Sequence, residues 1–69
     1  MIPENKRVID ILADLENAAV VSIIEDGVGH AYFGKEEIES IPYDLLEKKV
    51  ESYLVVMKVG GLFVDLEVE

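Results

Sequence analysis

The chain has 69 residues, and its 15 acidic and 6 basic residues give it a formal net charge of −9. Hydrophobic residues make up 51% of the sequence and Cys is absent, which excludes a disordered acidic tail, a disulfide framework and a thiolate metal site. The excess of negative charge argues against direct binding to nucleic acid or to an anionic membrane, because both require clustered Lys and Arg.

The shortness of the chain favours self-association. A domain of about 60 residues buries only about 60% of the surface that its unfolded chain exposes, and such domains usually gain a disulfide, a metal or a partner subunit. The longest mostly apolar stretch, residues 18–24, is far shorter than the roughly 20 residues that span a bilayer. The N-terminus also lacks the apolar region of a secretory signal. We therefore expect one soluble, cytoplasmic domain over residues 1–69 that forms a homodimer.

Two helical segments are predicted. The first covers about residues 4–16, where apolar residues recur at helical spacing on one face; they are Val8, Ile9, Ile11, Leu12 and Leu15. Residues 34–39 are highly charged and are expected to form a connector. The sequence that follows Ser40 predicts a short helical turn near residues 42–48.

Two β-hairpins are predicted, over about residues 18–33 and 50–68. The first turns at Asp26-Gly27 and the second at Gly60-Gly61, because such dipeptides favour two-residue hairpin loops. The predicted cross-strand pairs are Val21–Tyr32 and Ile23–His30 in the first hairpin, and Val59–Leu62, Met57–Val64 and Val55–Leu66 in the second.

The second hairpin has apolar side chains on both faces. One face is entirely apolar or aromatic, whereas the other combines Lys58, Asp65 and Glu67 with apolar residues. Either the rest of the chain covers these apolar residues, or they form a self-association surface, because apolar patches with polar rims mark interfaces and two-fold dimers are the commonest oligomers. The candidate self-association surface consists of Leu54, Val56 and Phe63.

The predicted fold class is α+β, with the N-terminal helix packed on an antiparallel sheet made from the two hairpins. The order of the strands is left open. The predicted core consists of Val8, Ile11, Leu12, Leu15, Val20, Ile24, Phe33, Leu45, Val55, Met57, Val64 and Leu66.

Catalytic and metal-binding chemistry find little support in the sequence. His30 is the only imidazole, and it could act as a general base only with a neighbouring carboxylate such as Glu25. No nucleophile or oxyanion motif accompanies it, so a surface histidine is the favoured interpretation. Transition-metal sites need more His or some Cys, and Glu25-Asp26-Gly27 lacks the ligand spacing of a calcium loop. We therefore expect no enzyme activity, no cofactor and no metal.

Five of the 15 acidic residues lie between residues 36 and 47 and form a candidate acidic partner surface: Glu36, Glu37, Glu39, Asp44 and Glu47. The favoured hypothesis is a small acidic, non-enzymatic interaction module that forms a homodimer and binds an unidentified protein. The alternative is an inhibitor that imitates nucleic acid, because carboxylates spaced like phosphates attract a basic groove. A solvated acidic surface is the plainer interpretation of the same residues.

The order of a helix, a hairpin, an Ile41-Pro42-x-x-Leu45-Leu46 turn and a final hairpin resembles short proteins of bacterial phages and prophages. This resemblance lies in the layout of the chain and includes no diagnostic motif. It implies an accessory or host-takeover role, and it assigns no residue a function.

Overall fold

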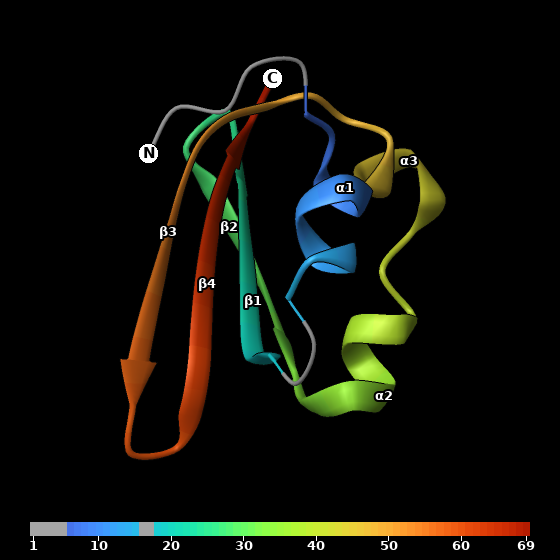
Figure 1. Ribbon diagram of the computed structural model, residues 1–69. Coiled ribbons are helices and arrows are strands. Elements are labelled where there is room, and N and C mark those ends of the chain that lie inside the picture. Colours follow the sequence, from blue (N-terminus) through green and yellow to red (C-terminus); the bar gives the residue numbers. More distant parts are fainter. Residues whose placement is uncertain (1–5, 16–17) are drawn as a thin grey trace.

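Four strands and three short helices form an α+β fold in the computed structural model, which describes residues 6–15 and 18–69. The strands form one sheet in the order β2-β1-β4-β3, and Figure 1 shows the helices together on one side of the molecule. In chain order the elements are α1 (Val8–Ala13), β1 (Ala18–Glu25), β2 (Val28–Phe33), α2 (Gly34–Glu39), α3 (Tyr43–Leu46), β3 (Val50–Lys58) and β4 (Gly61–Val68).

The sheet is mixed. Strands β1 and β2 form one antiparallel hairpin and β3 and β4 form another, as predicted, but the two hairpins meet through a parallel pairing of β1 with β4. The prediction of an antiparallel sheet was therefore wrong at its centre. The segment 34–49 carries the chain to the far edge of the sheet, so that β4 returns beside β1 in the same direction.

The first hairpin has the predicted register. Val21 pairs with Tyr32 and Ile23 with His30. Asp26 and Gly27 form the turn, and their φ angles of 52° and 78° are the two positive values that a type I′ turn requires.

The second hairpin turns one position earlier than predicted, at residues 59–60, and its predicted pairs were wrong by two positions. Lys58 pairs with Gly61, and Met57 pairs with Leu62 rather than with Val64. Gly61 has a φ of 123° and begins β4 instead of closing the loop. A slip of two positions keeps every side chain on its predicted face, because side chains alternate along a strand.

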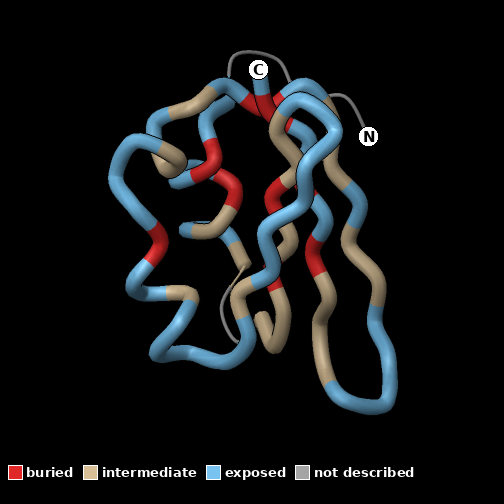
Figure 2. Tube along the Cα trace, turned by 180° about the vertical axis from the view of Figure 1, so that it is seen from behind, coloured by how far each residue is buried: buried red, intermediate tan, exposed pale blue. Residues whose placement is uncertain are grey.

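The core lies between the helices and one face of the sheet, where Figure 2 marks the buried positions in red. Helix α1 contributes Val8 and Ile11, and Leu12, Leu15, Leu45 and Val55 pack around the core. Four predicted core residues lie elsewhere: Val20 and Ile24 are half-buried, and Phe33 and Met57 are 58% and 72% exposed. The full buried set is Val8, Ile11, Val21, Ile23, Ile41, Val50, Val64, Leu66 and Val68.

Two helix predictions need correction. Helix α1 begins at Val8 rather than at residue 4, because Arg7 is extended and forms a β-bridge with Lys49; residues 4, 5 and 16 lie outside the described residues. The Arg7 N–H donates to the Asp10 carboxylate at 3.0 Å, which holds the start of the helix. The segment 34–39 is helix α2 rather than a connector, and its Ile38 packs against the core. The helical turn predicted near residues 42–48 is confirmed as α3.

Candidate interaction surface

The sheet has a second face that points away from the core. Side chains alternate between the two faces along a strand, and residues paired across strands share a face. The buried residues and their cross-strand partners therefore define the core face, and the residues between them define the other face. We call this second surface the open face. It consists of Gly29, Ala31 and Phe33 on β2, Val20, Ser22 and Ile24 on β1, Phe63, Asp65 and Glu67 on β4, and Ser52, Leu54, Val56 and Lys58 on β3.

One line of apolar side chains crosses the whole open face. Val20 on β1 pairs with Phe33 on β2 and with Phe63 on β4, and Phe63 pairs in turn with Val56 on β3. These four residues, here called the apolar row, run at right angles to the strands from one edge of the sheet to the other. The row is apolar at every position, whereas the next line along the strands contains Ser22 and Asp65.

The structure brings the predicted self-association residues together on the open face. Val56 and Phe63 belong to the apolar row, and Leu54 lies two positions before Val56 on β3 with 57% of its surface exposed. The buried residues of the helices belong instead to the core on the opposite face. Within residues 6–15 and 18–69, the helices therefore leave this apolar surface uncovered.

Sequence reasoning missed the contribution of the first hairpin to this surface. Val20 and Phe33 were assigned to the core, yet they continue the apolar row toward β2. The signal that distinguishes the two faces is polarity, because the open face carries Ser22 and the core face carries Val21 and Ile23 at the matching positions.

Charged residues lie on both sides of the apolar row. The Nζ atom of Lys58 lies 4.8 Å from the centroid of the Phe63 ring, within cation–π range. On the other side of the row, Asp65 and Glu67 are exposed on β4. The open face is thus an apolar band with a cation toward one end of the strands and anions toward the other.

The five residues of the acidic partner surface lie on or beside the helices, away from the open face. Glu36, Glu37 and Glu39 belong to α2, Asp44 belongs to α3, and Glu47 follows α3 directly. All five are exposed, and none of them forms an ion pair within the described part of the chain. The molecule therefore separates an acidic helical side from an apolar sheet face.

Lys48 connects the end of the helical segment to the ends of two strands. Its Nζ atom lies 2.6 Å from Oε2 of Glu25, at the end of β1, and donates a hydrogen bond to the carbonyl oxygen of Glu69 at 3.2 Å. The hydrogen bond to Glu25 and the attraction of that carboxylate raise the pKa of Lys48 above its ordinary value. Glu25, the carboxylate considered as a partner for His30, is therefore paired with Lys48 instead.

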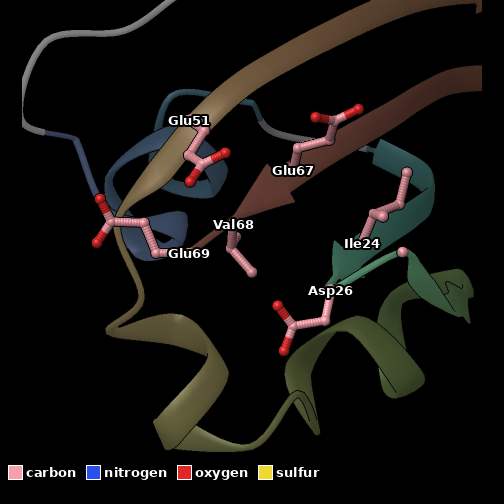
Figure 3. Close-up of a pocket in the computed structure, with 7 residues that line it drawn as sticks. Ile24, Asp26, Glu51, Glu67, Val68 and Glu69 are labelled. Atoms are coloured by element: carbon pink, nitrogen blue, oxygen red, sulfur yellow. The ribbon is translucent and has the colours of Figure 1, made fainter.

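A pocket of about 230 Å³ lies beside these strand ends. Its polar lining consists of carboxylates from Asp26, Glu51, Glu67 and Glu69, and Figure 3 shows those of Asp26 and Glu67 on opposite sides of Val68. Among the described residues, no group of three or more His, Cys, Asp or Glu is arranged to hold a metal ion. Carboxylates that do not converge repel anionic ligands and give a cation no common point of contact.

His30 is exposed on the edge strand β2, opposite Ile23. In the described part of the chain no helix is both long and apolar enough to cross a membrane. Comparison of the chain with protein-family models, with curated proteins and with solved structures gives no match. Any function must therefore be inferred from the surfaces of the molecule themselves.

Proposed function

We propose that the chain is a small, non-enzymatic interaction module that forms a homodimer through its open face and presents its acidic helical side to another protein. The observation that carries the proposal is the apolar row, with Phe33 58% exposed at one end and Leu54 57% exposed beside the other. Exposure of such an apolar surface to water is unfavourable in free energy, and association removes that surface from water.

The size of the chain supports the same proposal. The described core is small, and its most deeply buried side chains come mainly from β1 and β4, the two central strands. A second copy packed on the open face would bury these two strands on both of their faces, as in sheets that are covered on both sides. An accessory role of phage type, which the layout of the sequence suggests, is compatible with a module that acts by binding.

Sedimentation equilibrium of the protein and of its Phe63→Asp variant tests the proposal. Phe63 lies on the central strand β4 and projects from the open face, so a carboxylate there would be buried in the dimer but hydrated in the monomer. We expect a monomer–dimer equilibrium for the original chain and a monomer for the variant. The matched control is Tyr43→Asp, an aromatic residue on α3 with 65% exposure, which should leave the dimer intact. A strictly monomeric original chain would refute the dimer.

The alternative proposal is that the acidic helical side imitates nucleic acid and inhibits a protein with a basic groove. It is supported by five surface carboxylates, each without an ion-pair partner in the described part of the chain. Binding to a basic nuclease should then weaken steeply with added salt, because the attraction is electrostatic. Neutralisation of Glu36, Glu37 and Glu39 to Gln should abolish the binding.

The matched control for this alternative neutralises three acids beside the strand ends, Asp26, Glu51 and Glu67, and changes the net charge by the same amount. If both triple variants lose binding equally, net charge rather than the acidic helical side explains the attraction. Binding that ignores salt would exclude imitation of nucleic acid.

A further inference from the structure

The charges on the open face are placed symmetrically about the apolar row. Lys58 pairs with Gly61, two positions before the pair Val56–Phe63, and Asp65 pairs with Leu54, two positions after it. At about 3.3 Å per residue, Lys58 and Asp65 are separated by about 13 Å along the strands. This distance is too long for an ion pair within one chain, and neither residue forms one with any described residue.

From this symmetry we infer that the occupant of the open face is a second copy of the chain, turned about a two-fold axis that runs along the apolar row between the two sheets. The inference rests on the proposed homodimer and specifies its geometry. Rotation about that axis superimposes the two apolar rows and reverses the strand direction. It therefore brings Lys58 of each copy level with the partner's Asp65, one strand spacing of about 4.8 Å to the side and about 10 Å across the gap between the sheets. The backbones are then about 11 Å apart, and the lysine and aspartate side chains, which extend toward each other from the two open faces, together span this distance.

Charge complementarity favours this axis over a two-fold axis that runs parallel to the strands. An axis parallel to the strands would leave each residue at the same height along the strands but would place β4 of one copy over β1 of the other. Asp65 would then face the partner's Ser22, which lies at the same height, and would meet no cation. A buried carboxylate without a cation is costly, because desolvation is not offset. With the axis along the apolar row, both copies of Asp65 receive a lysine and both apolar rows are covered.

The area of the open face is sufficient for such a dimer. Four strands spaced about 4.8 Å apart and about eight residues long give a face of about 20 by 25 Å, or about 500 Å². Two copies would bury about 1,000 Å² together, which is near the lower limit for a specific interface. We therefore expect a dimer of moderate affinity, whose strength is sensitive to the two Lys58–Asp65 contacts.

Charge exchange tests the geometry. Lys58→Glu places two carboxylates together at each contact and should raise the dimer dissociation constant about tenfold or more. Asp65→Lys should weaken the dimer similarly at about 0.15 M salt, where the repulsion between the net charges is largely screened, although it changes the net charge of each chain from −9 to −7. The double variant keeps the net charge of −9 and restores opposite charges across the interface, so its dissociation constant should return to within about threefold of the original. Circular dichroism of each variant establishes that the fold is retained.

A mixing experiment removes any effect of the single substitutions on the monomer. A heterodimer of the Lys58→Glu and Asp65→Lys chains contains two favourable contacts. In one of them the introduced glutamate of the first chain meets the introduced lysine of the second, and in the other the original Lys58 and Asp65 meet. Labelled Lys58→Glu chains should therefore bind Asp65→Lys chains about tenfold more tightly than either variant binds itself.

The outcomes separate this geometry from the proposed function. If Phe63→Asp abolishes the dimer but charge exchange does not rescue it, the open face is the interface and the two-fold axis is overturned. If Phe63→Asp leaves the dimer intact, association uses another surface, such as a sheet edge, and both proposals fail. An original chain that stays monomeric likewise overturns both.

Discussion

The ammonium group of Lys58 lies 4.8 Å from the centre of the Phe63 ring. This contact places a scarce positive charge against the apolar row, to which Phe63 belongs. Lys58 is one of only 6 basic residues in a chain of net charge −9. Association through the open face therefore brings together two strongly negative bodies, each of which offers one cation to the contact.

Added salt should strengthen the dimer. Two charges of −9 with centres about 25 Å apart repel each other by several kcal/mol at about 0.01 M salt, and by less than about 1 kcal/mol at about 0.15 M. The two Lys58–Asp65 contacts contribute only about 0.2–1 kcal/mol each, so the repulsion dominates at the lower salt concentration. The dissociation constant should fall by about tenfold or more between these two salt concentrations. Sedimentation equilibrium at each concentration measures it, and a rise with salt would mean that local attraction dominates.

Neighbouring isoleucines on β1 should differ sharply in their contribution to stability. Ile23 is fully buried under the helices, whereas Ile24 is half-buried on the open face. Ile23→Ala should lower the free energy of unfolding by about 2–4 kcal/mol, and Ile24→Ala by about 1 kcal/mol. Urea unfolding should be measured in the Phe63→Asp background, where dimerisation does not contribute. Equal losses would mean that the open face is covered within the chain.

The same pair of isoleucines shows what could be predicted from sequence. The turn at Asp26-Gly27 determined the register of the first hairpin, because that turn admits residues with positive φ. Apolar character alone did not show which face is directed to the core, since Val20 and Ile24 are as apolar as Val21 and Ile23, and within β1 only the polar Ser22 marks the open face. The parallel contact of β1 with β4 depends on the path of residues 34–49, and no local signal reports it.

The candidate surfaces were only partly predictable for the same reason. Leu54, Val56 and Phe63 share one face of a single hairpin, so alternation was enough to group them. Their continuation through Val20 to Phe33 required the order of the strands, which places residues distant in sequence side by side.

Removal of the Lys48 contact should change the dependence of stability on pH at the alkaline end. The pKa of Lys48 is raised in the folded chain, so the contact stabilises the fold below the unfolded pKa of about 10.5 and is lost as the pH rises through the folded pKa. Lys48→Met should melt at a lower temperature than the original chain at neutral pH. The difference should shrink above about pH 10.5. A constant difference across this range would show that the methylene groups, rather than the charge, carry the effect.

The two consecutive glycines of the second hairpin should respond differently to alanine. Gly61 has a φ of 123°, and a Cβ built there would lie 3.0 Å from the Cβ of Ala19, which is a steric conflict between two strands of the sheet. Gly60 has room for a Cβ, whose nearest neighbours are ring atoms of Phe63 at 3.8 Å or more. Gly61→Ala should therefore lower the free energy of unfolding by about 1–3 kcal/mol, and Gly60→Ala should change it by less than about 1 kcal/mol. Urea unfolding of both variants measures the difference. If Gly60→Ala were the more damaging change, the turn would lie at Gly60-Gly61 and β4 would begin at Leu62, with a different set of cross-strand pairs along the open face.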